Sequence, residues 1–136
     1  DLWETANGIA GAGRDVDSDG DGVENGIEFV IGGDPNGADS NSLLPTVVVD
    51  ATDLVFTFRQ TQDSAGEDVF VEYGTNLTGW TEAEAGEPVG PNPVTIATTT
   101  DGFAPGVDRV EVTIPRALFG GGETGFARLV NEAPAP

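Results

Sequence analysis

Side chains that carry oxygen recur at regular spacing in the run DSDGDGVENGIE, which covers residues 17 to 28. If Asp17 is counted as position 1, carboxylates stand at positions 1, 3, 5 and 12, a glycine at position 6 and an asparagine at position 9. Alternate residues of a tight loop point their side chains inward, and a carboxylate one helical turn further on closes the shell. Hard cations such as Ca²⁺ bind about six to eight oxygen atoms in this way. The spacing predicts a calcium site with these ligands: Asp17, Asp19, Asp21, the carbonyl of Val23, Asn25 and Glu28.

The spacing is that of an EF-hand calcium loop, in which Gly22 would make the sharp turn. The alternative is a set of solvated Asx turns, because Asp and Gly are common in loops. Four like charges packed this closely would destabilise the loop unless a cation neutralised them, which favours the metal site. Three further aspartates would complete the shell, hold a second ion or be solvated turn residues: Asp15, Asp34 and Asp39.

Residues 1–44 are predicted to hold the loop between two short helices. The first covers residues 2 to 6, and the second runs from Asn25 to Ile31, where Gly32 and Gly33 stop it. Val23, Ile27, Val30 and Ile31 form an apolar stripe along that second helix.

From Thr46 onward the apolar residues alternate with polar ones, which is the period of half-buried strands. Turn sequences such as Asp101-Gly102 separate the strands, and no helical pattern lies between them. Seven strands are expected, at residues 47–50, 54–59, 69–73, 80–83, 94–98, 109–114 and 125–130. We therefore predict a mainly β chain: an antiparallel β-sandwich over residues 45–131, preceded by the helical calcium-loop segment and followed by an extended Pro-rich tail at 132–136.

Composition narrows the function further. The chain of 136 residues has 24 acidic and 5 basic side chains, a formal net charge of −19. Such a chain repels nucleic acid and anionic membrane surfaces, and no apolar run is long enough to span a bilayer. It contains no His, Cys, Lys or Met. The usual nucleophile–base pairs are therefore missing, and we expect no catalysis. Because residue 1 is not a translation start, we expect a processed chain or an excised fragment, and a secreted, extracellular location.

Two departures distinguish the loop from that of a calcium sensor. Glu24 occupies position 8, where paired EF-hands carry an aliphatic residue, and the chain has no second loop. The loop therefore resembles the isolated loops of dockerins and thrombospondin type-3 repeats, and the ion is expected to be structural.

A wider resemblance covers nearly the whole chain. Trp3, Asn7-Gly8-Ile9 and DSDGDGVENGIEFVIGGDP (17–35), then LVFTFRQ (54–60), VFVEYGTNLTGW (69–80) and GFARLV (125–130), are similar to a calcium-loop and β-sandwich module of bacterial secreted proteins. That resemblance implies a non-catalytic unit at the C-terminus of large exported proteins, many of which degrade polysaccharides.

Two other kinds of site are candidates. Asn76-Leu77-Thr78 matches an N-glycosylation sequon, or Asn76 is simply a turn residue. Tyr73 and Trp80, with Trp3, would stack sugar rings if they formed an exposed platform, but aromatic residues in strands more often belong to the core.

Two functions follow from these patterns. The first is a structural subunit of an extracellular filament or surface layer, with calcium as its staple and copies of itself as partners. A terminal segment that paired with an exposed strand edge of the next copy would give head-to-tail growth. The alternative is an accessory, carbohydrate-binding module of an exported polysaccharide-degrading enzyme.

Overall fold

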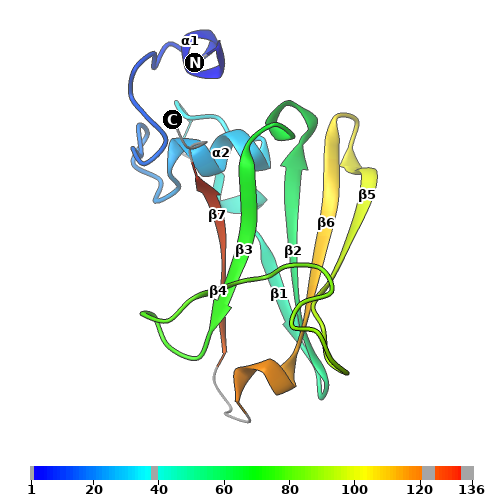
Figure 1. Cartoon of the computed structure of the whole chain (residues 1–136). Coiled ribbons are helices and arrows are strands. Elements are labelled where there is room, and N and C mark those ends of the chain that lie inside the picture. The colour runs from blue at the N-terminus through cyan, green and yellow to red at the C-terminus, as the bar shows by residue number, and fades with distance from the viewer. Residues whose placement is uncertain (1, 38–39, 121–124, 133–136) are drawn as a thin grey trace.

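The structure, a computed structural model, describes residues 2–37, 40–120 and 125–132 and confirms the mainly β fold. Seven strands form two antiparallel sheets that pack as a sandwich, and two short helices lie at one end (Figure 1). The helices are α1 (Leu2–Ala6) and α2 (Asn25–Ile31), with 3₁₀ turns at Ser40–Leu43, Gln62–Ser64 and Arg116–Phe119. The strands are β1 (Thr46–Val49), β2 (Asp53–Thr61), β3 (Asp68–Gly74), β4 (Thr81–Glu82), β5 (Thr95–Ala104), β6 (Val107–Pro115) and β7 (Phe126–Glu132).

The two sheets differ in width. One has four strands in the order β1-β2-β6-β5, and the other has three in the order β4-β3-β7. Every neighbouring pair is antiparallel. Because β4 has only two residues, the smaller sheet is in effect a β3–β7 pair. In the larger sheet, the buried residues lie on the two central strands, β2 and β6.

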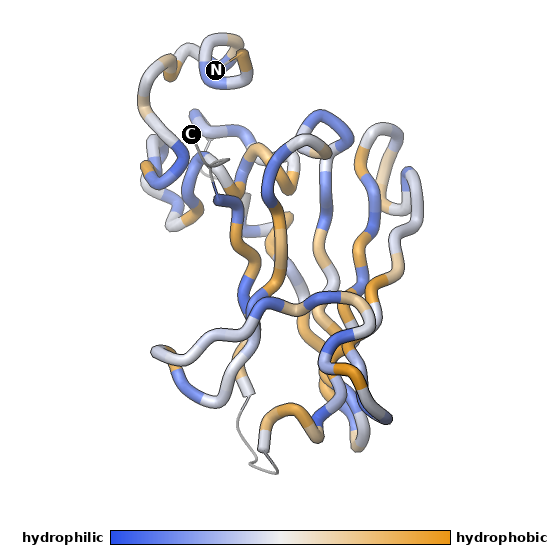
Figure 2. Tube along the Cα trace, in the orientation of Figure 1, coloured by the Kyte–Doolittle hydropathy of each residue, from blue (hydrophilic) through white to orange (hydrophobic). Residues whose placement is uncertain are grey.

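The core lies under those central strands and follows the period of two. On β2 the buried residues are Leu54, Phe56 and Phe58, and on β6 they are Val110, Val112 and Ile114. The register places these residues directly opposite one another in three pairs: Leu54 with Ile114, Phe56 with Val112 and Phe58 with Val110. Directly opposite side chains share one face of a sheet, so this ladder forms one wall of the core. Hydrophobic stretches lie along the middle of the strands in Figure 2.

Strand β5 is longer than the sequence predicts. A turn was expected at Asp101-Gly102, but the strand continues to Ala104 through an irregular register. Asp101 takes a positive φ of 56°, and its carboxylate accepts hydrogen bonds from the Gly106 backbone N–H (2.8 Å) and from Gln62 (2.9 Å). These bonds stabilise a kink within the strand, so the hairpin turns only after Ala104.

Helix α2 belongs to the same core as the sandwich. Its Val30 and Ile31 are fully buried, and both pack with the β-strand residues of the core. Side chains of β2 bind its last carbonyls, since Thr61 Oγ1 donates to the Phe29 carbonyl (2.8 Å) and Arg59 Nε donates to the Ile31 carbonyl (3.2 Å). Asn131 of β7 donates to the Gly26 carbonyl (2.9 Å). The helix is thus held against β2 and β7.

The chain ends differ from the expected domain scheme in one respect. Glu132, expected in the tail, is the last residue of β7, and residues 133–136 lie outside the described residues. Among the residues that the structure describes, no helix is long and apolar enough to cross a membrane.

Candidate metal centre

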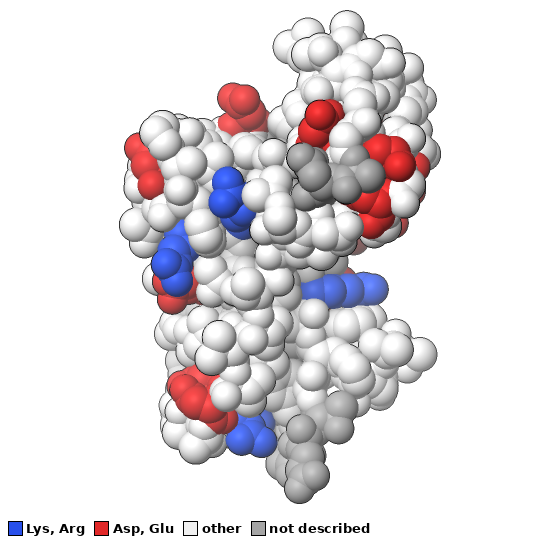
Figure 3. Space-filling model, turned by 180° about the vertical axis from the view of Figure 1, so that it is seen from behind, with Lys and Arg blue, Asp and Glu red and all other residues white. Residues whose placement is uncertain are grey.

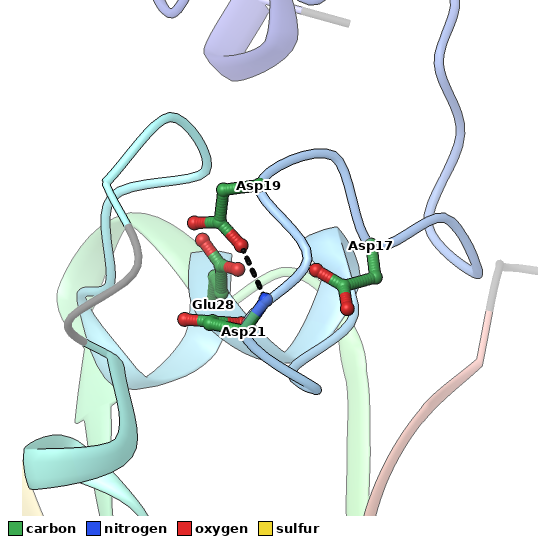
Figure 4. Close-up of side chains that lie close together, drawn as sticks. All are labelled: Asp17, Asp19, Asp21 and Glu28. Atoms are coloured by element: carbon green, nitrogen blue, oxygen red, sulfur yellow. Dashed lines mark hydrogen bonds between the residues drawn. The ribbon is translucent and has the colours of Figure 1, made fainter.

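Four carboxylates meet beside the N-terminal end of α2. Asp17, Asp19 and Asp21 come from the loop and Glu28 comes from the helix, and one oxygen of each lies within 4.8 Å of the others (Figure 4). Seen from behind, acidic side chains gather at the helical end of the molecule (Figure 3). At about 5 Å and an effective dielectric constant of about 20, two unit charges of like sign repel by about 3 kcal/mol. The cluster therefore needs a proton or a cation to be stable.

Glu28 is the least solvated member of the cluster. The residue is fully buried, and neither Oε1 nor Oε2 has a hydrogen-bond partner. One oxygen of Asp19, Oδ2, is also buried without a partner. Buried carboxylate oxygens in proteins are normally hydrogen-bonded, paired or bound to a metal. Three buried oxygens without hydrogen-bond partners, all within one acidic cluster, fit the presence of a bound cation.

The pKa values of the same residues reflect this environment. Burial, and then the charges of Asp19 and Asp21, raise the pKa of Glu28 to about 8. Burial also raises the pKa of Asp19, against the effect of its hydrogen bond from the Asp21 backbone N–H. A cation at the centre of the cluster would reverse these effects, because opposite charge favours the ionised carboxylate.

Asp17 and Asp21 shape the loop as well as facing the cluster. Asp17 accepts hydrogen bonds from the backbone N–H groups of Gly20 and Gly22, both at 2.9 Å, and the bond from Gly22 is the main cause of its lowered pKa. Asp21 accepts one from Val23 N–H at 2.9 Å. Gly22 has a φ of 90°, in the left-handed region that favours glycine. The sharp turn predicted at position 6 is therefore present.

Asn25 makes hydrogen bonds that its predicted role as a ligand does not require, and that role remains a prediction. Its side chain is 1% exposed; Nδ2 donates to the Gly13 carbonyl (3.1 Å) and to Ser18 Oγ (2.9 Å), and Oδ1 accepts from Ser18 N–H (3.4 Å). These bonds tie the start of α2 to the preceding loop. Val23, expected to lend its carbonyl, buries its side chain in the core. Asn25 is thus an anchor of the loop, held by bonds that its spacing alone does not reveal.

The junction between loop and helix depends on residues that the ligand pattern missed. Gly26 N–H donates to the Arg14 carbonyl (2.9 Å), and a Cβ on Gly26 would lie 3.0 Å from the Cβ of Arg14. Arg14 in turn pairs with Glu67 (2.8 Å) and donates to Asn131 (3.3 Å). The only sequence signal for this contact is a glycine in the first turn of a helix, where glycine is otherwise unfavourable.

Of the additional aspartates, Asp15 and Asp34 are not among the four carboxylates of the cluster. Asp34 is exposed and accepts a hydrogen bond from Asn36 N–H (2.9 Å), and its charge contributes to the raised pKa of Glu28. Asp15 lines a surface groove with Arg14 and Glu24. Asp39 lies outside the described residues.

The aromatic residues considered for sugar binding each pack on a different partner. Tyr73 is buried against Phe119, with ring centroids 5.8 Å apart, so it offers no exposed face and cannot belong to a platform. The guanidinium of Arg128 lies 4.2 Å from the ring centroid of Trp80. Trp3 packs on Phe29, with centroids 5.4 Å apart. The predicted sugar platform that includes Tyr73 is therefore wrong, because the Tyr73 side chain is part of the hydrophobic core.

Asn76 lies in an exposed turn between β3 and β4. Its Oδ1 accepts hydrogen bonds from the backbone N–H groups of Thr78 (2.9 Å) and Gly79 (2.8 Å), which is the pattern of an Asx turn. Glycosylation at this residue remains a prediction.

Comparisons with protein-family models, with curated proteins and with solved structures found no match to this chain. The likeness to dockerin and thrombospondin type-3 loops thus rests on the sequence motif.

Proposed function

We propose that this chain is a non-catalytic, calcium-binding structural protein of the extracellular space. The observation that carries the proposal is Glu28, a fully buried glutamate whose two oxygens have no partner and whose neighbours are three aspartates. An ionised carboxylate buried without a partner costs several kcal/mol, and a divalent cation would offset that cost.

The donor set favours calcium over other metals. All four side chains offer only carboxylate oxygen, and the chain has no His or Cys to select a softer metal. Two ligands on opposite sides of Ca²⁺ lie about 4.8 Å apart, because each lies about 2.4 Å from the ion. For Mg²⁺ the corresponding separation is about 4.2 Å. The oxygens here lie within 4.8 Å of one another, a span that Ca²⁺ accommodates.

The role of the ion follows from how the cluster is built. Three ligands belong to the loop and the fourth to α2, which is itself bound to β2 and β7 by the hydrogen bonds of Thr61 and Asn131. An ion held by all four would therefore connect the N-terminal loop to the sandwich. A chain without cysteine has no disulfide to do this.

Thermal unfolding with calcium and with a chelator tests this proposal. We expect chelation to lower the melting temperature of the wild-type protein, because an ion that binds only the folded state stabilises it by mass action. Glu28→Ala and Asp19→Ala should abolish the response to calcium. Asp15→Ala, a nearby change outside the cluster, should retain it. A wild-type melting temperature that changes neither with calcium nor with chelator would contradict the proposal.

We further propose that copies of this protein assemble into a filament or layer. Apolar side chains exposed on the outer strands of the larger sheet support this, among them Val47, Val48 and Val49 on β1. Electron microscopy with and without chelator tests the assembly, and monodisperse particles at every calcium concentration would contradict it. Retention of such monomers on insoluble polysaccharide would instead support the accessory-module alternative.

A further inference from the structure

The outer strands of the four-stranded sheet are exposed on both faces. All four residues of β1 are exposed, and so are nine of the ten residues of β5. In a sandwich, one face of each strand normally packs on the opposite sheet. Here alternate residues of β2 and β6 are buried, whereas no residue of β1 or β5 is.

Some of these exposed side chains point toward the core side of the sheet. Val47 stands opposite Phe56 and Val49 opposite Leu54, while Ile96 of β5 stands opposite Val112. Directly opposite residues share a face, and Leu54, Phe56 and Val112 are buried. Val47, Val49 and Ile96 nevertheless remain 49%, 56% and 41% exposed. Apolar side chains on the core face therefore remain partly accessible at both margins of the sheet.

The two edges also lack charge, in a chain with a net charge of −19. Thr46–Val49 carries no charged side chain, and neither do residues 95–100 of β5. The edges of the smaller sheet differ, since β4 contains Glu82 and β7 contains Arg128 and Glu132. Proteins commonly protect exposed edges with charges that oppose strand pairing. Among the described strands, β1 and β5 therefore form the edges at which acidic copies would approach one another with least repulsion.

Strand direction makes these two edges complementary. The larger sheet has four strands and every neighbouring pair is antiparallel, so β1 and β5 run in opposite directions. If a second copy in the same orientation lies beside the first, its β1 is antiparallel to the first copy's β5 and its core face lies on the same side. The smaller sheet has three strands, so β4 and β7 run in the same direction and a repeat could not continue its antiparallel pattern.

We propose that the β1 edge of one copy pairs with the β5 edge of the next, so that the four-stranded sheets join into one continuous antiparallel sheet. A register with Val49 opposite Ile96 and Val47 opposite Thr98 keeps all four side chains on the core face. It also places Val48 opposite Ala97 on the outer face. The contact is heterologous and leaves a free edge at each end, which gives open head-to-tail growth.

This interface rests on the assembly proposed above and supplies its contact surface. It uses two strands of the folded domain, whereas the sequence suggested pairing by a terminal segment.

A charge on the outer face of β1 tests the pairing. Val48 is 65% exposed, so Val48→Asp should fold normally but place a negative charge in the middle of the edge strand, which opposes strand pairing. Leu77→Asp is the matched control, because Leu77 is 68% exposed in the turn between β3 and β4. In sedimentation and electron microscopy, we expect Val48→Asp to remain monomeric and Leu77→Asp to assemble as the wild type does. Assembly of Val48→Asp at the wild-type concentration would overturn this interface alone.

Cysteine cross-linking identifies the partner strand, because the chain has no cysteine of its own. A mixture of Val49→Cys and Ile96→Cys proteins should form a covalent heterodimer under mild oxidation, while each protein alone should form far less dimer. A double variant should form ladders. Equally efficient self-linking of Val49→Cys would indicate a symmetric β1–β1 contact and overturn the proposal. A wild type that never assembles, with no cross-link in the mixture, would overturn both the interface and the assembly.

Discussion

At Glu28, burial and like charge act in the same direction, and both disfavour the ionised carboxylate. Without a metal, the side chain keeps its proton up to a pH of about 8, so folding is linked to protonation. With a cation bound, the carboxylate must be ionised, and metal binding competes with the proton. One residue thus links calcium, protons and stability.

Glu28→Gln should therefore have opposite effects with and without calcium. In chelator at pH 7, the amide removes a buried acid and should stabilise the fold by on the order of 3 kcal/mol, since each pKa unit corresponds to about 1.4 kcal/mol. With calcium present, the same variant should gain little or nothing from the ion. Chemical denaturation under both conditions measures this, and a variant less stable than wild type in chelator would contradict it.

The pH dependence of the calcium-free protein follows from the same pKa. The unfolded glutamate releases its proton near pH 4.5, whereas the folded one keeps it to about 8. Between these values the unfolded state binds fewer protons, so stability should fall as pH rises from 4.5 and level off above about 8. Denaturation across this range in chelator tests the sign. Glu28→Gln should show a much weaker slope.

At the scale of elements, helix α2 brings Glu28 to the loop because its opposite face is fixed to the sandwich. Val30 and Ile31 are fully buried, and Arg59 and Thr61 bind the last carbonyls of the helix. At its start, Asn25 holds the loop through Gly13 and Ser18. The aspartates are therefore positioned by contacts that do not involve a metal.

Asn25→Asp distinguishes an anchor from a ligand. If Asn25 bound the ion, an aspartate there would keep or strengthen calcium binding. Because its Nδ2 donates two hydrogen bonds in a buried site, we expect Asp to lose both donors and add a buried charge. The variant should lose about 2 kcal/mol or more of stability both in calcium and in chelator. Unchanged stability together with tighter calcium binding would contradict the anchor role.

Local patterns predicted the elements well and their contacts less well. The period of two located all seven strands, and the apolar stripe with Gly32 and Gly33 located α2, because these signals are local. The four carboxylates were predicted for the same reason, since loop spacing places them together. The kink at Asp101 was missed because its hydrogen bond from Gln62 joins residues far apart in the chain. Nor does a sequence show that β1 and β5 contain no buried residue.

At the scale of the whole molecule, the proposed calcium site and the proposed assembly contact lie on different surfaces. The acidic cluster lies at the helical end, while the uncharged strand edges lie along the sides of the larger sheet (Figure 1). Calcium would thus act on assembly through the stability of the subunit and by screening the repulsion between copies of charge −19, without touching the contact itself.

The calcium content of the purified protein tests the central claim most directly. After dialysis against buffer with micromolar calcium, we expect elemental analysis to find at least one calcium ion per chain. The Glu28→Ala protein, prepared in parallel, should have lost that ion, and the Asp15→Ala control should retain it. A wild-type protein without bound calcium, or a Glu28→Ala protein with the same content as the wild type, would contradict the account.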